Sequence, residues 1–197
     1  MVGLSFLLKS LEISFLAGDC RAVLGKKKSD ATTKAVVLTN DHNIREPEEL
    51  KKLKAAHPSI LSTHSLSLEE RDLVKYYNGE PVYVKGMLQP TRCLGDFILK
   101  SKEFIRSIPL LKRFASFNSP YITSEPEVTV FEIQEEDDFI VMASDGVWDE
   151  LDNQDIVDIV SESLQKGNSI DSAANTVVEA CLAHAASNSR CYCCIRV

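Results

Sequence analysis

Five segments of the chain have the apolar spacing of β-strands: residues 13–24, 34–39, 81–88, 127–133 and 139–144. Between the first two lies a polar loop from Gly25 to Asp30, which predicts a β-hairpin with three lysines at a solvated tip. The apolar run over residues 2–8 is followed by Lys9 and Glu12 and has no basic residues before it. It therefore predicts a buried strand or an arbitrary chain start rather than a signal peptide.

Residues 46–58 have the pattern of a well-marked helix. Proline occupies the first helical position, acidic residues fill the first turn, and a second proline ends the segment. Leu50, Leu53 and His57 fall at helical spacing and form a narrow apolar stripe. We interpret His57 as a helix-end residue rather than a metal ligand.

Two more helices are predicted near the carboxyl end, over residues 153–165 and 170–186, with Gly167 as the stop between them. Residues 59–80 are polar and predicted to be irregular. Strands come first and helices are grouped at the end, which predicts a single α+β layered domain.

Composition narrows the class of protein. The chain has 197 residues, of which 44% are hydrophobic and 26% charged, as in soluble globular domains. A net charge of −7 argues against general nucleic-acid binding, and no apolar run reaches the length of a membrane span. The basic residues between 97 and 117 are interpreted as a solvated helix face, with a surface for acidic or phosphorylated partners as the alternative. These residues are Lys100, Lys102, Arg106, Lys112 and Arg113.

The cysteines fall into two groups. Cys20, Cys93 and Cys181 are scattered and are expected to be small buried hydrophobic residues in a reducing compartment. An intracellular protein of the cytoplasm or nucleus is therefore expected, with a mitochondrial location left open. The other three cysteines crowd residues 191–197 without a second pair at zinc spacing, which favours a frayed or artificial chain end over a metal site.

The segment from Ala143 to Asp149 carries the clearest chemistry. An apolar strand runs into Asp145, Gly146 follows, and Asp149 lies four residues further on. A carboxylate at a strand end, followed by a residue that permits close approach, suits a hard metal ion. Taken alone, the same pattern is also that of a simple turn.

Four more acid-bearing motifs accompany this segment in a fixed order along the chain. They are Gly18-Asp19-Cys20-Arg21, Asp41-His42-Asn43, Thr91-Arg92-Cys93-Leu94-Gly95-Asp96 and Ser124-Glu125-Pro126-Glu127-Val128. Together the five motifs resemble the metal-dependent protein serine/threonine phosphatases of type 2C, the PPM class. Cys20 replaces the usual serine, and Cys93 replaces the usual alanine. The resemblance covers about residues 13–186. Residues 40–58 and 120–126 are similar to the pyruvate dehydrogenase phosphatase branch.

The resemblance implies a partial α-β-β-α sandwich of two antiparallel sheets flanked by helices, lacking the family's amino-terminal half. It implies one partial domain over residues 1–190, followed by the atypical cysteine-rich tail of residues 191–197. The implied activity is hydrolysis of phosphoserine and phosphothreonine by water activated by two or more Mg²⁺ or Mn²⁺ ions, with no protein nucleophile. The implied partner is a phosphorylated protein, and the domain is expected to be monomeric.

The resemblance also assigns roles to individual residues. Asp145 matches the metal-binding aspartate of the last strand, and Asp19 and Asp149 match positions that hold a further metal in many members. Gly146 keeps the turn close to the ions. Arg21, Arg92 and Asp96 are expected to support the site, with Arg92 as a direct phosphate ligand as the alternative.

Two expected motifs are missing. The family's Asp-Gly-His-Gly segment does not occur, and residues 186–191 lack the family's Asp-Asn pair. The chain is therefore expected to be either a fragment of an active phosphatase, truncated at both ends, or a catalytically inactive phosphatase-like binding module. In either case, we expect little or no activity from this chain by itself.

A third class, the aspartyl-phosphate hydrolases, also uses a strand-end Asp-Gly pair. These enzymes need a nucleophilic aspartate two residues before the second one. Position 143 is alanine, which disfavours this class.

Overall fold

The computed structural model describes residues 2–8, 11–57, 73–109 and 119–187, with side chains from residue 17 onwards. The chain divides into two compact units. The first unit contains residues 1–2, 17–19 and 41–126, and the second contains residues 3–16, 20–40 and 127–197. Each unit is described by itself.

The second unit contains two three-stranded sheets, ordered β1-β2-β7 and β4-β3-β8. The first sheet consists of β1 (Val2–Leu8), β2 (Leu11–Ala17) and β7 (Glu127–Glu132). The second sheet consists of β3 (Arg21–Lys27), β4 (Thr33–Val37) and β8 (Asp137–Ala143). The pairs β2–β7, β3–β4 and β3–β8 are antiparallel, so the predicted hairpin is confirmed.

The prediction of one strand over residues 13–24 is wrong. The chain leaves β2 after Ala17 and begins β3 at Arg21, and the two strands belong to different sheets. The break falls at Gly18, whose φ of 132° is rare for residues that carry a side chain. A continuous apolar pattern therefore concealed a change of sheet.

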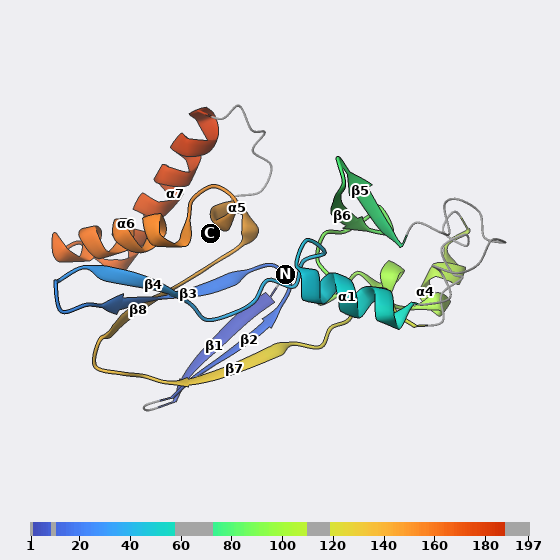
Figure 1. Cartoon of the computed structure of the whole chain (residues 1–197), viewed down its shortest axis with the longest axis horizontal. Coiled ribbons are helices and arrows are strands. Elements are labelled where there is room, and N and C mark those ends of the chain that lie inside the picture. The colour runs from blue at the N-terminus through green and yellow to red at the C-terminus, as the bar shows by residue number, and fades with distance from the viewer. Residues whose placement is uncertain (1, 9–10, 58–72, 110–118, 188–197) are drawn as a thin grey trace. The chain divides into compact units, whose positions relative to one another are not determined.

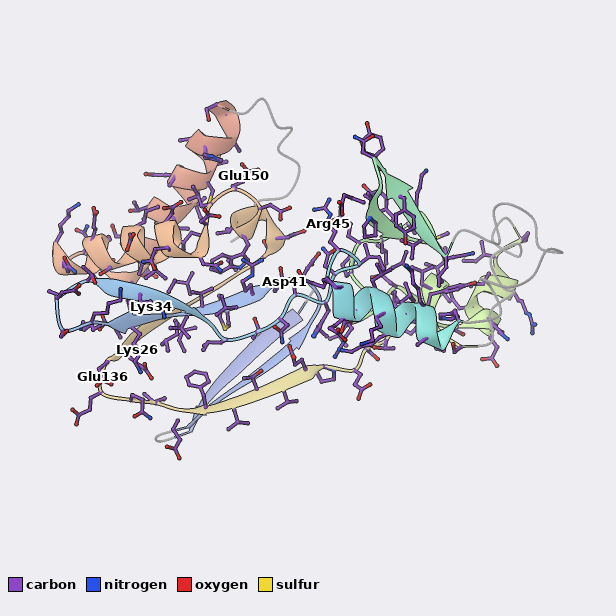
Figure 2. The ribbon with its side chains drawn as sticks, in the orientation of Figure 1. Lys26, Lys34, Asp41, Arg45, Glu136 and Glu150 are labelled. Atoms are coloured by element: carbon purple, nitrogen blue, oxygen red, sulfur yellow. The ribbon has the colours of Figure 1, made fainter. Side chains whose placement is uncertain are left out.

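Lys27 and Lys28 of the hairpin are exposed, as predicted, whereas Lys26 is half-buried, and two of the three lysines form ion pairs. Lys26 Nζ lies 3.3 Å from Asp137 Oδ1 and 4.0 Å from Glu136 Oε2, and Lys27 Nζ lies 2.6 Å from Asp138 Oδ1. Lys26 and Glu136 are labelled at this end of the sheet in Figure 2. The acidic turn before β8 thus neutralises part of the basic hairpin.

Helices α5 (Asp145–Trp148), α6 (Asn153–Gln165) and α7 (Ile170–Ser187) complete the second unit. The last two confirm the predicted helices, and Gly167 between them has a φ of 80°. Figure 1 shows α6 running along the sheet that contains β3 and β4. Apolar residues of β3, α5, α6 and α7 form one buried cluster: Val23, Val147, Trp148, Ile156, Val157, Val160, Ala173, Val177 and Cys181.

The first unit contains α1 (Pro47–Ala56), β5 (Val74–Tyr77), β6 (Glu80–Val84), the 3₁₀ helix η1 (Phe97–Leu99) and α4 (Lys102–Ser107). Its buried cluster is Ile44, Leu53, Leu73, Val74, Val84, Cys93, Leu99, Ile105, Tyr121 and Ile122. Helix α1 confirms the predicted helix.

Strand β5 lies in a region predicted to be irregular, and that prediction is wrong. β5 pairs with β6 across a tight turn at Asn78 and Gly79, whose φ values are 51° and 87°. Asn-Gly is the preferred sequence for such a turn, so the hairpin had a signal that the polar flanks obscured. Helix α4 accounts for part of the basic region, whereas Lys112, Arg113 and the tail of residues 191–197 lie outside the described residues. The mixed fold of helices and antiparallel sheets is confirmed.

Candidate active site

Asp145 occupies the point where β8 ends and α5 begins. Ser144 has extended backbone angles and precedes the helix, and the Gly146 N–H donates to Asp145 Oδ1 at 3.0 Å. The Asp145 side chain is half-buried. The strand end thus presents a carboxylate whose near oxygen is held by the adjacent backbone.

Trp148 connects this short helical turn to β8 through a hydrogen bond. Its indole Nε1–H donates to the carbonyl oxygen of Ala143 at 3.0 Å, and its ring is buried. The Asp149 N–H donates to the carbonyl oxygen of Asp145 at 2.8 Å. Asp145 and Asp149 are therefore one helical turn apart, which places them on the same side of that turn, with Asp149 exposed.

Arg21 joins three elements of the second unit. It begins β3 and is the register partner of Ala143 on β8. Its Nη1 donates to Asn153 Oδ1 at the start of α6 at 2.8 Å, and its Cζ lies 5.5 Å from the centroid of the Trp148 ring. Arg21 therefore contacts α6 through a hydrogen bond and the turn that carries Asp145 through a cation–π contact with Trp148.

Asp19 belongs to the first unit and is buried, with 3% of its surface exposed. Asn43 Nδ2 donates to Asp19 Oδ2 at 3.1 Å. The neighbouring Gly18 accepts at its carbonyl oxygen from the His42 N–H at 2.9 Å. The first two acid-bearing motifs are thus in direct contact.

Arg92 forms a two-pronged ion pair with Glu49 of α1. Arg92 Nη2 donates to Oε1 at 2.8 Å and Nε donates to Oε2 at 3.2 Å. Lys52 Nζ also donates to Oε1 at 2.8 Å, and the Thr91 hydroxyl donates to Oε2 at 2.6 Å. The structure therefore places the Arg92 guanidinium against a buried carboxylate, in the two-pronged geometry that arginine forms with carboxylates.

The electrostatics of Glu49 reflect this set of donors. Burial by itself would raise the pKa of Glu49, but hydrogen bonds from Arg92, Lys52 and Thr91 outweigh it and lower the pKa to about 2. Sequence analysis did not single out Glu49 as a site residue. The available signal was its spacing: Glu49, Leu53 and His57 lie four residues apart on one helical face, and all three are buried.

Asp96 follows Gly95 in a left-handed backbone conformation, with a φ of 47°. The Cys93 thiol donates to Asp96 Oδ2 at 3.0 Å, and the Cys93 carbonyl oxygen accepts from Lys100. Burial, followed by the contact with Asp96, raises the pKa of Cys93 to about 11. A thiol with this pKa is protonated near neutral pH.

The predicted site residues are divided between the units. Asp145, Gly146, Asp149 and Arg21 gather at one end of β8, whereas Asp19, Arg92 and Asp96 belong to the first unit. Carboxylate oxygens are suitable ligands for Mg²⁺ or Mn²⁺, so the donor chemistry fits these metals. Among the described residues, however, no group of three His, Cys, Asp or Glu side chains is placed to hold an ion.

Comparison with known proteins agrees with this set of motifs. Residues 15–190 match the protein phosphatase 2C family. The chain is 38% identical over 158 residues to human mitochondrial pyruvate dehydrogenase (acetyl-transferring) phosphatase 2, covering 73% of this chain and 27% of that protein. It is 36% identical over 159 residues to the Arabidopsis thaliana probable protein phosphatase 2C 38, covering 77% of this chain and 37% of that protein. The chain thus spans well under half the length of these relatives, and the similar identities do not separate the two branches.

Solved structures show the same fold. A serine-threonine phosphatase 2C from Toxoplasma gondii superposes with a TM-score of 0.60 at 19% identity, covering 95% of this chain and 53% of the other. A second Toxoplasma gondii phosphatase superposes with a TM-score of 0.54 at 19% identity, covering 86% of this chain and 40% of the other. The family match, the relatives and the shared fold lead to one assignment: the chain belongs to the protein phosphatase 2C family.

Proposed function

We propose that this chain belongs to a protein serine/threonine phosphatase that uses divalent metal ions to hydrolyse phosphoserine and phosphothreonine. The observation that carries the proposal is the position of Asp145, half-buried at the end of β8 within the Ala143–Asp149 motif. Members of the protein phosphatase 2C family are metal-dependent and act on phosphoproteins. A hard carboxylate at this position is what such chemistry requires.

In this proposal, Asp145, Asp149 and Asp19 would hold Mg²⁺ or Mn²⁺. When bound, these ions would lower the pKa of water and offset negative charge on the phosphoryl oxygens. Gly146 would keep the turn close to the ions, since it carries no side chain. Arg21 would hold the turn against β3 and α6, and Arg92 and Asp96 would stabilise the first unit's motif segment.

The proposed partner is a phosphorylated protein, bound by a monomeric domain over residues 1–190. The described part of the chain contains no helix with the length and apolarity needed to span a membrane. Among the described residues, Cys93 and Cys181 are buried free thiols, which supports the proposed reducing, intracellular compartment.

The test is phosphate release from a phosphothreonine peptide by the purified chain in the presence of Mn²⁺. Because the sequence lacks the Asp-Gly-His-Gly aspartate, we expect release to be slow. The informative comparison is therefore between the wild-type chain and Asp145→Asn. We expect release to require Mn²⁺ and to fall to background in Asp145→Asn.

Equal release by both proteins would contradict the proposal. Mn²⁺ binding with no release at all would favour the inactive binding module. Asp152→Asn is the matched control, since Asp152 is exposed, lies in the same segment and precedes α6.

A further inference from the structure

Glu49 has a larger set of partners than a surface ion pair requires. Its carboxylate accepts from three side chains, those of Thr91, Arg92 and Lys52, and only 7% of the residue is exposed. Buried carboxylates with a full set of donors are rigid points in a structure, because moving them would leave charge unpaired. Here Glu49 contacts Thr91 and Arg92, which belong to a segment without a regular strand or helix.

A continuous series of contacts leads from Glu49 to Asp19 within the first unit. The Thr91 hydroxyl donates to Glu49, and the Thr91 N–H donates to the carbonyl oxygen of His42 at 2.8 Å. The His42 N–H donates to the carbonyl oxygen of Gly18 at 2.9 Å. Gly18 directly precedes Asp19, so the carboxylate of α1 is linked to the segment of Asp19 by three successive hydrogen bonds.

The segments in this series depend on such contacts. Among the described residues, residues 41–46 and 88–96 contribute only isolated bridges, which join Asn43 to Pro90, Leu88 to Val84 and Arg92 to Thr123. Isolated bridges give little cooperative support compared with a full strand ladder. Side-chain anchoring therefore carries more of the positional restraint here than in the sheets of the second unit.

We propose that Glu49 is a positioning residue that fixes the segment carrying Asp19 through Thr91 and His42. The importance of Asp19 as a ligand rests on the proposed function, but the positional link does not. The competing explanation is that Glu49 only neutralises Arg92. The two explanations differ in what happens when the Thr91 hydroxyl is removed and the Arg92 pair is left intact.

The first measurement is amide hydrogen exchange of the metal-free protein, comparing wild type with Glu49→Gln. Glu48→Gln is the matched control, since Glu48 is the adjacent residue, is exposed and contacts Lys51 at 3.4 Å. We expect exchange at the His42 and Thr91 amides to become at least about tenfold faster in Glu49→Gln, with no change in Glu48→Gln. Amides of the β3–β8 ladder should be unchanged.

The second pair of variants separates positioning from neutralisation of Arg92. Thr91→Val removes the hydroxyl with little change of shape, and Thr91→Ser keeps a hydroxyl. We expect faster exchange at His42 in Thr91→Val and near wild-type exchange in Thr91→Ser. Wild-type exchange at His42 in Thr91→Val would overturn the proposal, and so would a uniform change across both units in Glu49→Gln.

Mn²⁺ affinity connects the link to the proposed function. If Asp19→Asn weakens binding, Glu49→Gln and Thr91→Val should each weaken it by a smaller factor, and wild-type affinity in both would overturn the functional part. If Asp19→Asn leaves the affinity unchanged, the metal role of Asp19 fails, and hydrogen exchange alone decides the positioning role. Val177→Ala, a core change in the second unit, controls for a general loss of stability.

Discussion

The two units hold their motif residues by different means. In the first unit, Glu49 accepts hydrogen bonds from the side chains of Arg92 and Thr91. Backbone hydrogen bonds then connect Thr91 through His42 to Gly18, which precedes Asp19. In the second unit, Asp145 sits at the rim of an apolar cluster in which Trp148 and Val147 are buried. Charged networks depend on protonation state, whereas apolar packing depends mainly on volume and shape. The two halves of the motif set should therefore respond to different perturbations.

The largest expected effect is the loss of the Trp148 side chain. Trp148→Ala would leave a cavity beside α5, and it would remove the hydrogen-bond donor of the Ala143 carbonyl oxygen. We therefore expect a loss of about 3–5 kcal/mol in the free energy of unfolding. Urea denaturation measures this loss. Trp148→Phe keeps most of the packing and should cost about 1–2 kcal/mol. A loss below about 1 kcal/mol for Trp148→Ala would show that packing does not hold this turn.

The next effect belongs to the first unit and depends on pH. The pKa of Glu49 is lowered from 4.5 to about 2 in the folded protein, so the folded state favours the ionised form. The associated stability is complete above about pH 4.5 and is lost as pH falls towards 2, with a total of about 3 kcal/mol.

Unfolding measured between pH 7 and pH 2 tests this dependence. The wild-type protein should lose more stability than Glu49→Gln over the acidic range, whereas Glu48→Gln should follow the wild type. If the free energy of unfolding changed with pH in the same way for wild type and Glu49→Gln, the ionised Glu49 network would not be what stabilises the first unit at neutral pH.

A smaller effect tests the packing of the second unit. A Cβ atom at Gly25 would lie 2.5 Å from Cζ of Phe139, so Gly25→Ala would force the ring to move. We expect a loss of about 1–3 kcal/mol, measured by urea denaturation. Adding Phe139→Leu should recover part of this loss, because the smaller side chain vacates the space. A double variant that shows simple additivity would contradict the steric explanation.

The smallest effect concerns the outer edge of β4. Gln154 Oε1 accepts from the Ala35 N–H at 3.0 Å, and its Nε2 donates to the Thr33 carbonyl oxygen at 2.8 Å. Gln154→Ala would leave both groups to water, and we expect a loss of about 1 kcal/mol together with faster exchange at Ala35. Gln165→Ala, on the same helix but bonded to Ser161, should leave Ala35 unchanged.

Local patterns predicted much of the fold. The helix over residues 153–165 has strong periodicity, and its observed bounds, Asn153–Gln165, agree with the prediction. The division at Gly18 was missed because apolar residues continue on both sides of it and spacing alone carries no information on which sheet a strand joins. A strand overlapping β6 was predicted, but β5 was missed because its tyrosines, Tyr76 and Tyr77, are exposed and its polar flanks resemble a loop.

The residues of the candidate site were likewise predicted only in part from the sequence. Asp145, Asp19 and Arg21 were identified by their motifs, and their roles as metal ligands and support remain predictions. Glu49 was missed because its partners, Thr91 and Arg92, lie more than forty residues away in sequence. Trp148 was identified only as a motif letter, since its bond to the Ala143 carbonyl depends on how the chain turns after β8.

Our central proposal is that Asp145 is a metal ligand in the active site of a phosphatase. The most direct test is Mn²⁺ binding to the purified chain by isothermal titration calorimetry, comparing wild type, Asp145→Asn and Asp152→Asn. Loss of a ligating carboxylate should weaken binding by at least about tenfold in Asp145→Asn, whereas Asp152→Asn should bind as the wild type does. Equal Mn²⁺ affinity in wild type and Asp145→Asn would contradict the claim.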